Sequence, residues 1–203
     1  MKENNIKNLL KDSKAYYENN DYYEIFSKAE DGEGKVAAYL KEQAKEKIVL
    51  DAGCGTGKFL EQLENESSKY IGVDLSFEQL IKAQSKKKKS NTIFINSNLK
   101  DIMLESNSVD LIVSPWVLGT VTDLVERTKC LNELKRVLKP GGEIILIENE
   151  ENSEFEYLRN HHKDKKTNIY NNWIRNNDFN KVEEINTYFN FANLKEAKLC
   201  FRK

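Results

Sequence analysis

Three glycines at alternate positions follow a short apolar run in the segment VLDAGCGTG, residues 49–57. Gly53, Gly55 and Gly57 permit positive φ angles and allow a ligand to approach the backbone closely. We expect a helix to begin near Lys58, and the free N–H groups at a helix N-terminus attract a carboxylate or a phosphate. The segment therefore predicts a binding loop for a cofactor, with a strand–helix turn that binds nothing as the alternative.

The glycine spacing argues against two familiar nucleotide loops. A dinucleotide loop, G-x-G-x-x-G, would need its third glycine at Lys58, whose long side chain would obstruct the close packing of helix on strand. A P-loop, G-x-x-x-x-G-K-[ST], would begin at Ala52 and would need a hydroxyl residue at Phe59, so it fails at both positions.

An acidic residue follows the next apolar run at the spacing that a nucleoside cofactor requires. Asp74 ends IGVD and lies 21 residues after Gly53. A carboxylate there can accept hydrogen bonds from both hydroxyls of a ribose. Together with Asp51, which precedes the glycines as D-x-G-x-G-x-G, this pattern resembles motif I of the class I S-adenosylmethionine (SAM)-dependent methyltransferases. The resemblance extends over roughly residues 47–148 and is strongest to the small-molecule branch of that family.

The resemblance implies a cofactor and a set of residues that hold it. The cofactor is SAM and the product is S-adenosylhomocysteine (SAH). Asp51 would lie near the methionine amino group, Asp74 at the ribose, and Asn98 would accept from the adenine amino group in place of the usual Asp. The implied cofactor-binding residues are Asp51, Ala52, Gly53, Cys54, Gly55, Gly57, Asp74, Leu75, Asn98, Leu99, Ser114, Tyr17 and Tyr22.

The chain shows no evident catalytic constellation. Methyl transfer from a sulfonium is an in-line displacement that needs positioning and exclusion of water, and it requires no metal. His161 and His162 are the only histidines and lie in the polar stretch RNHHKDKK; we expect a surface loop there, with a base role as a hypothesis. Glu148, Glu150 and Glu151 would either favour a cationic substrate or simply face solvent.

The stretch Ser114-Pro115-Trp116 ends the fourth apolar run, where it would face the reacting methyl. It resembles the N/D/S-P-P-Y/F/W motif of amino-methyltransferases but has one proline instead of two. An amine-directed role therefore stays open, and Trp116 is a candidate wall of the pocket. Tyr170 and Trp173, at i and i+3 on an expected helix, are interpreted as core residues.

Alternating apolar runs and helical segments predict a doubly wound α/β fold with a mostly parallel, Rossmann-like sheet. Helix starts are expected at Ser76-x-x-Gln79 and at Asp123-x-x-Glu126, and 139–142 (KPGG) should end the second of these helices. Leu124, Leu131, Leu134 and Leu138 are expected to form its apolar stripe. The five runs expected as strands, nearly continuous in Val, Ile and Leu, are 47–52, 70–74, 92–96, 109–114 and 143–148.

We expect a sheet of the seven-stranded type with 181–191 as its first antiparallel strand. The last strand would be absent or reduced to 198–201 (KLCF). Residues 1–45 are interpreted as an N-terminal helical lid, and 46–203 as the SAM-binding domain, in one domain overall. Tyr16, Tyr17, Tyr22 and Tyr23 would either face the sulfonium or pack the lid helices.

Composition limits the partners. The net charge of −1 over 203 residues provides no basic field for nucleic acid, so we expect a small-molecule acceptor. Cys54, Cys130 and Cys200 form no C-x-x-C pair, which argues against a zinc site or a disulfide framework. Without a signal-like N-terminus or a run of about 20 apolar residues, we expect a cytoplasmic protein that makes no membrane contact.

The sequence therefore predicts a SAM-dependent methyltransferase acting on a small molecule. One alternative is a non-catalytic or degenerate SAM-binding module. Another is an aminopropyltransferase using decarboxylated SAM, but SPWVLGT (114–120) stands where its acidic loop would be.

Overall fold

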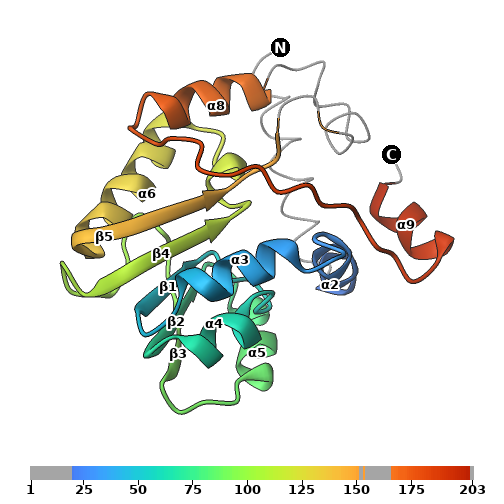
Figure 1. Cartoon of the computed structure of the whole chain (residues 1–203), viewed down its shortest axis with the longest axis horizontal. Helices are drawn as coiled ribbons and strands as arrows, with labels where there is room; N and C mark the ends of the chain where they lie inside the picture. The colour runs from blue at the N-terminus through green and yellow to red at the C-terminus, as the bar shows by residue number, and fades with distance from the viewer. Residues whose placement is uncertain (1–19, 151–152, 154–165, 202–203) are drawn as a thin grey trace. The chain divides into compact units, whose positions relative to one another are not determined.

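Strands and helices alternate along the chain, as expected for a doubly wound sheet (Figure 1). The structure is a computed structural model that describes residues 20–150, 153 and 166–201. Its strands are β1 (Ile48–Ala52), β2 (Lys69–Asp74), β3 (Thr92–Asn96), β4 (Val109–Pro115) and β5 (Leu138–Ile147). Its helices are α2 (Asn20–Ala29), α3 (Lys35–Gln43), α4 (Leu60–Glu66), α5 (Phe77–Lys86), the 3-10 turn η1 (Leu118–Thr120), α6 (Leu124–Val137), α8 (Lys166–Arg175) and α9 (Leu194–Phe201).

The five strands form one parallel sheet in the order β3-β2-β1-β4-β5. Asp51 of the central strand β1 is in register with Gly72 of β2 and Val113 of β4. The chain builds outward from β1 in one direction and then in the other, so the strand order reverses between β1 and β4. In open α/β sheets the crevice at the carboxyl ends of such strands is where ligands bind.

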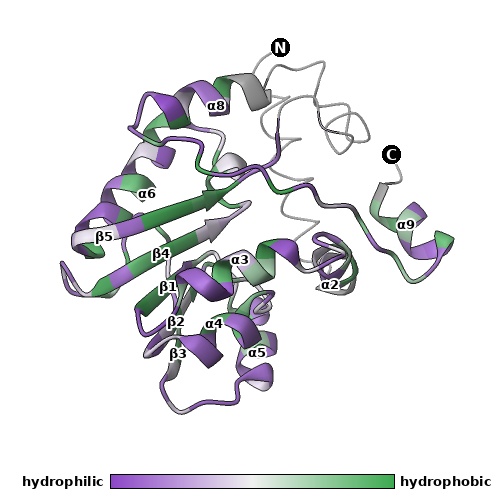
Figure 2. Cartoon of the chain, viewed as in Figure 1, coloured by the Kyte–Doolittle hydropathy of each residue, from purple (hydrophilic) through white to green (hydrophobic). Residues whose placement is uncertain are grey.

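Apolar side chains cover both faces of this sheet, and Figure 2 shows the strands among the apolar segments. Alternation along β1 sends Leu50 to one face and Val49 to the other. The first face packs against α6 and α8, and the second packs against α3 and α4. This two-sided burial explains why the strands read as continuous apolar runs rather than alternating ones.

The two predicted helix starts are confirmed by their caps. The Ser76 hydroxyl accepts from the Gln79 backbone N–H, and Asp123 accepts from the N–H groups of Val125 and Glu126. Helix α4 begins at Leu60, two residues after Lys58, and its N-cap Phe59 makes no side-chain hydrogen bond.

The end of α6 and its apolar stripe differ from the prediction. The helix ends at Val137, and β5 begins at Leu138 rather than at residue 143. Gly141, at φ +80°, lets the strand continue past an irregularity in its pairing with β4. Leu124 is half exposed, and the position that turns inward instead is Arg127, which is 4% exposed.

The chain divides into two compact units, residues 36–185 and residues 1–35 with 186–203. In the second unit, the backbone after Asn186 is tied to the end of α2: Gly32 N–H donates to Tyr188 O (2.9 Å) and Asn190 N–H donates to Ala29 O (2.9 Å). The expectation of a strand over 181–191 is therefore wrong, because this backbone finds its partners at a helix end rather than at a strand. Residues 198–201 belong to helix α9. The lid interpretation of residues 1–45 stays a prediction.

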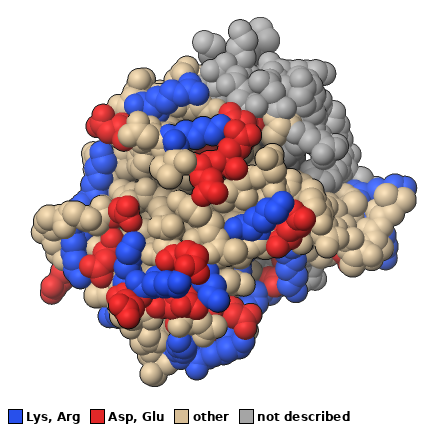
Figure 3. All heavy atoms as spheres, in the orientation of Figure 1, with Lys and Arg blue, Asp and Glu red and all other residues tan. Residues whose placement is uncertain are grey.

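Charge is mixed on one face of the molecule. On the face shown in Figure 3, acidic and basic side chains lie side by side and neither sign covers a broad area. Among the described helices, none combines the length and apolarity needed to cross a membrane.

Candidate cofactor and acceptor site

The glycine loop after β1 adopts the backbone that its composition predicts. Gly53, Gly55 and Gly57 all have positive φ angles, at 82°, 55° and 77°. Gly53 N–H donates to the carbonyl of Val73 at 2.8 Å, which ties the loop to the end of β2. A Cβ on Gly53 would lie 2.5 Å from a methyl of Val117, so the residue must be glycine both for its φ angle and for space.

Asp74 turns back to the glycine loop from the end of β2. Its Oδ2 accepts from Gly55 N–H and its Oδ1 accepts from Ser76 N–H, each at 2.8 Å. Burial raises the pKa of this carboxyl, while hydrogen bonds from the N–H groups of Ser76, Gly55 and Leu75 oppose the rise. A carboxylate accepts up to about four hydrogen bonds, so the fixed Asp74 carboxylate keeps capacity for a further donor. The structure thus brings together the loop and the acid that the sequence paired.

Asp51 lies at the end of β1 and is only 2% exposed. Its Oδ2 accepts from the hydroxyl of Tyr70, a fully buried residue of β2, at 2.8 Å. Burial raises the pKa of Asp51 from 3.8 to about 7; the Tyr70 hydrogen bond opposes this rise, and the charge of Asp74 adds to it. A buried carboxyl of this kind favours a cationic partner. The sequence analysis did not identify Tyr70 as part of the site, because its position after an exposed Lys69 gave no sign that its hydroxyl makes a buried hydrogen bond.

Cys54, also in the loop, has a buried side chain and is not a nucleophile at neutral pH. Burial and the charges of Asp51 and Asp74 hold the pKa of its thiol well above 9.0. It contributes shape instead: its sulfur lies 2.9 Å from where a Cβ on Gly72 would sit.

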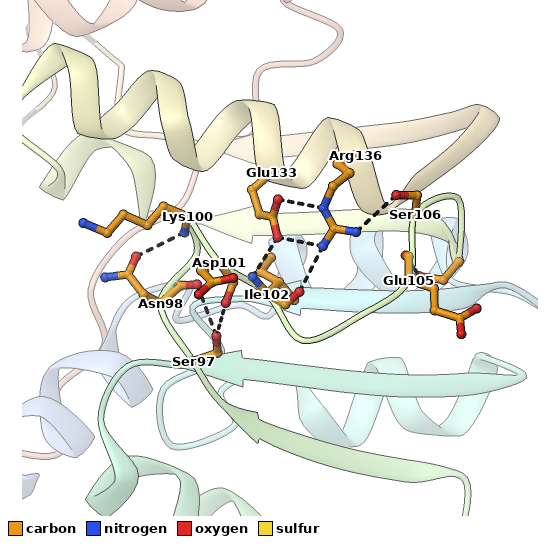
Figure 4. A network of polar contacts seen from close by, with 10 residues as sticks. Ser97, Asn98, Lys100, Asp101, Ile102, Glu105, Ser106, Glu133 and Arg136 are labelled. Carbon is orange, nitrogen blue, oxygen red and sulfur yellow. Dashed lines mark hydrogen bonds and ion pairs between the residues drawn. The ribbon is translucent and has the colours of Figure 1, made fainter.

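A polar network fixes the loop after β3 that carries Asn98 (Figure 4). The Asn98 side-chain oxygen accepts from Lys100 N–H at 3.1 Å. Further along, Ile102 N–H donates to Glu133 (2.8 Å), and Arg136 donates both to the Ile102 carbonyl (3.0 Å) and to Glu133 (2.7 Å). These two side chains of α6 therefore hold the loop against the helix, and Asn98 keeps one lone pair for another donor.

The end of β4 carries a strained aromatic residue. Trp116 has φ +55°, which is unusual for a bulky side chain and costs about 1–3 kcal/mol. Its backbone N–H donates to the carbonyl of Ile147 at 2.7 Å. Its ring stacks on that of Phe59, with 6.1 Å between the ring centroids, and the ammonium of Lys58 lies 4.2 Å from the Trp116 ring centroid. The indole N–H is buried and has no hydrogen-bond partner among the described residues. Backbone strain of this kind is concentrated at functional sites, which supports the prediction that Trp116 forms a wall of the binding pocket.

The remaining predicted residues are placed as follows. Ser114 is fully buried and its hydroxyl donates to the carbonyl of Ala52 at 3.4 Å, joining the ends of β4 and β1. Leu99 is 9% exposed, whereas Leu75 is 70% exposed. Tyr17, His161 and His162 lie outside the described residues, and Tyr22 falls in α2 of the other unit.

A second cluster lies at the ends of β4 and β5, on the face covered by α6 and α8. The hydroxyl of Tyr170 donates to Glu148 at 2.6 Å, and the buried guanidinium of Arg127 lies 4.7 Å from the Tyr170 ring centroid. Sequence interpretation noted Glu148 and Tyr170 separately and missed Arg127. The helical spacing of Arg127 with Cys130, Leu131 and Leu134 was the available signal. The described residues hold no group of three side chains suited to a metal ion.

The sheet order, the glycine loop and its paired acid are those of the class I SAM-dependent methyltransferase fold. Residues 50–146 match the family model described as "Methyltransferase domain", so this part of the chain is a methyltransferase domain of that type.

Relatives with this domain act in different processes. The chain is 37% identical over 112 residues to a tRNA (carboxymethyluridine(34)-5-O)-methyltransferase from Arabidopsis thaliana, covering 55% of this chain and 26% of that one. It is 32% identical over 120 residues to the ubiquinone/menaquinone biosynthesis C-methyltransferase UbiE of Campylobacter jejuni, covering 56% and 48%. The chain thus spans less than half the length of either relative.

Part of the fold is similar to that of a solved structure. A protein from Pyrococcus horikoshii, PH0226, superposes with a TM-score of 0.53 at 28% identity, over 62% of this chain and 64% of that one.

Proposed function

We propose that this chain binds SAM at the carboxyl ends of β1, β2 and β3 and transfers its methyl group to a small-molecule acceptor over β4 and β5. The observation that carries the proposal is the Asp74 carboxylate, held at 2.8 Å both by the Gly55 N–H of the glycine loop and by the Ser76 N–H at the start of α5. When bound, SAM supplies an electrophilic methyl group on a sulfonium.

The residues present fit this cofactor. Asp74 keeps a lone pair for a ribose hydroxyl, and Asn98 has one for an adenine amino group. Asp51 is a buried carboxyl whose pKa stands near 7, and a cationic amino group beside it would favour its charged form. The three positive-φ glycines let a ligand lie directly against the backbone.

The chain's own residues orient reactants and exclude water, which is the main demand of an in-line displacement. Val117 closes over Gly53, and the stacked Trp116 and Phe59 rings form an apolar wall beside the end of β4. A small acceptor rather than a nucleic acid is supported by the net charge of −1 and by the mixed charges in Figure 3.

Titration calorimetry with SAM and SAH tests the cofactor proposal. We expect micromolar binding to the native chain and a loss of at least tenfold in Asp74→Asn, whose amide nitrogen would face an N–H donor in place of a carboxylate oxygen. One tenfold loss corresponds to about 1.4 kcal/mol.

Asp110→Asn is the matched control. Asp110 also accepts from a backbone N–H, that of Ile48 at 2.9 Å, but it stands at the start of β4, at the opposite edge of the sheet. Its replacement should leave SAH affinity unchanged. No binding by the folded native chain, or equal losses in both variants, would contradict the proposal. Formation of SAH with an acceptor separates an enzyme from a module that only binds SAM.

A further inference from the structure

The carboxyl ends of β4 and β5 carry a carboxylate whose position has chemical consequences. Glu148 directly follows β5, and its neighbour Ile147 is in register with Pro115 of β4. Glu148 therefore stands beside Trp116, next to the strand end at which the proposed function places the reacting methyl.

Among the described residues, a hydrogen bond and a close approach of backbone orient this carboxylate. The hydroxyl of Tyr170, on α8, donates to Oε1 at 2.6 Å. The other oxygen, Oε2, faces the backbone of η1: a Cβ on Gly119 would lie 3.2 Å from it and 3.4 Å from the Tyr170 ring. Any side chain at position 119 would crowd the pair, so glycine allows the turn after β4 to approach the carboxylate closely.

A buried cation lies behind the pair. The Arg127 guanidinium stacks near the rings of Tyr170 (4.7 Å) and Trp173 (5.2 Å), and its Nε donates to the carbonyls of Leu118 and Val121. Its Nη1 has no hydrogen-bond partner within the described part of the chain.

The ionisation of these groups is linked. Burial lowers the pKa of Arg127, and the charges of Tyr170 and Glu148 oppose that fall. Burial, followed by the charge of Glu148, raises the pKa of Tyr170, so its phenol remains a donor to the carboxylate. Both neighbours therefore stabilise Glu148 as an anion rather than as a neutral acid.

We propose that Glu148 binds the reacting nitrogen of an amine acceptor, with Tyr170 as the positioning residue that aims the carboxylate; this inference rests on the proposed function. An ammonium bound at Glu148 first releases one proton to water, and in the transfer the freed nitrogen lone pair forms the new C–N bond while the C–S bond breaks and its electron pair stays on sulfur. The nitrogen becomes cationic beside Glu148, which takes its proton and passes it to water.

The alternatives are less consistent with this geometry. An anionic acceptor would be repelled by Glu148, and among the described residues the nearby Nη1 of Arg127 is buried. A hydroxyl acceptor needs a strong base before attack, whereas a carboxylate stabilised by a phenol and a guanidinium is a weak one. An amine carries its lone pair already and gains from a nearby anion as its charge develops.

The two tryptophans of the chain allow a direct test by fluorine NMR. Labelling with 5-fluorotryptophan gives one resonance for Trp116, at the end of β4, and one for Trp173, which stacks on Tyr170 at 5.8 Å. Trp173→Phe assigns the signals. SAH-saturated protein is then titrated with n-propylammonium, with 1-propanol as the neutral probe and propionate as the anionic probe.

We expect only n-propylammonium to shift the Trp173 resonance saturably. Glu148→Gln should weaken this binding at least tenfold, and Tyr170→Phe should weaken it about threefold while SAH affinity is unchanged. Glu150→Gln is the matched control, because Glu150 lies two residues away and bonds Lys181 at 2.8 Å; it should leave the binding unchanged.

SAH calorimetry on every variant separates the two proposals. Failure of the native chain to bind SAH overturns the proposed function and this inference with it. Normal SAH binding with no ammonium response, a response to propionate, or equal binding by Glu148→Gln overturns this inference alone.

Discussion

The two halves of the sheet's carboxyl edge are built in different ways. On the β1–β2 side, backbone groups form most of the site. Three glycines lie within five residues, and Asp74 accepts from backbone N–H groups at 2.8 Å. On the β4–β5 side, side chains from three separate segments meet, namely Arg127 of α6, Glu148 after β5 and Tyr170 of α8.

This difference matches what each half would bind under the proposed function. A loop of backbone donors and glycines suits one unchanging cofactor, and most substitutions there would be strained or would clash. Side chains drawn from distant segments can be exchanged one at a time without disturbing the loop. Acceptor preference can therefore vary among relatives that keep the same cofactor half.

The largest expected effect is a clash at Gly53. Gly53→Ala should lower the free energy of unfolding by about 3 kcal/mol, because the positive φ costs about 1 kcal/mol and the crowding against Val117 adds about 1–3. Urea denaturation measures the loss.

Gly141→Ala is the matched control for that variant. Gly141 has nearly the same φ, +80°, but nothing lies within 4 Å of a Cβ built there, so the loss should be about 1 kcal/mol. Val117→Ala added to Gly53→Ala should recover the difference. Equal losses at the two glycines would show that Val117 imposes no constraint.

Two arginines of α6 compare the halves directly. Arg127→Met should cost about 2 kcal/mol of stability, because the buried carbonyls of Leu118 and Val121 lose their donor, with SAH affinity changed less than about threefold. Arg136→Met should cost less than about 1 kcal/mol, because its ion pair with Glu133 is partly exposed.

Arg136→Met should nevertheless weaken SAH binding more than Arg127→Met does. We expect a loss of about threefold to tenfold, because the loop carrying Asn98 loses its anchor at Ile102. Calorimetry and urea denaturation of both proteins check the pair. Identical effects on SAH affinity would remove the distinction between the halves.

A further expected effect is a pH slope from Asp51. Its folded pKa of about 7 exceeds its usual 3.8, so between these values the folded state keeps a proton that the unfolded state releases. Stability should therefore fall as pH rises from about 4 to about 7, by at most about 1.4 kcal/mol per unit. Asp51→Asn should flatten this slope in denaturation curves at pH 5, 6, 7 and 8, since Asp74 remains in both proteins. Parallel curves would argue against the shifted ionisation.

Local signals made the cofactor half predictable. The glycine spacing, the acid at Asp74 and the caps at Ser76 and Asp123 each depend on a few neighbouring residues, and the structure has them as expected. The buried hydrogen bond from Tyr70 to Asp51 joins two strands through their register, which no single segment reveals.

The acceptor half depends on tertiary packing, and prediction was weaker there. Apolar patterning predicts a nonpolar side chain at the buried position 127, but the residue there is an arginine. Its burial depends on the rings of Tyr170 and Trp173, which lie against its guanidinium and come from a distant segment of the chain. The segment 181–191 has the composition of a strand, but its backbone hydrogen-bonds to the end of α2. Its conformation is therefore determined by the hydrogen-bond partners it meets in the fold rather than by its strand propensity.

Helix α6 also sets the distance between two anchoring side chains. Arg127 and Arg136 are nine residues apart on one unbroken helix, about 13.5 Å along its axis and half a turn out of phase. Arg127 anchors η1 beside the proposed acceptor site and Arg136 anchors the loop of Asn98, so the helix fixes the distance between them. A single residue inserted between the two would turn one anchor by about 100° relative to the other and put the two ends of the site out of alignment.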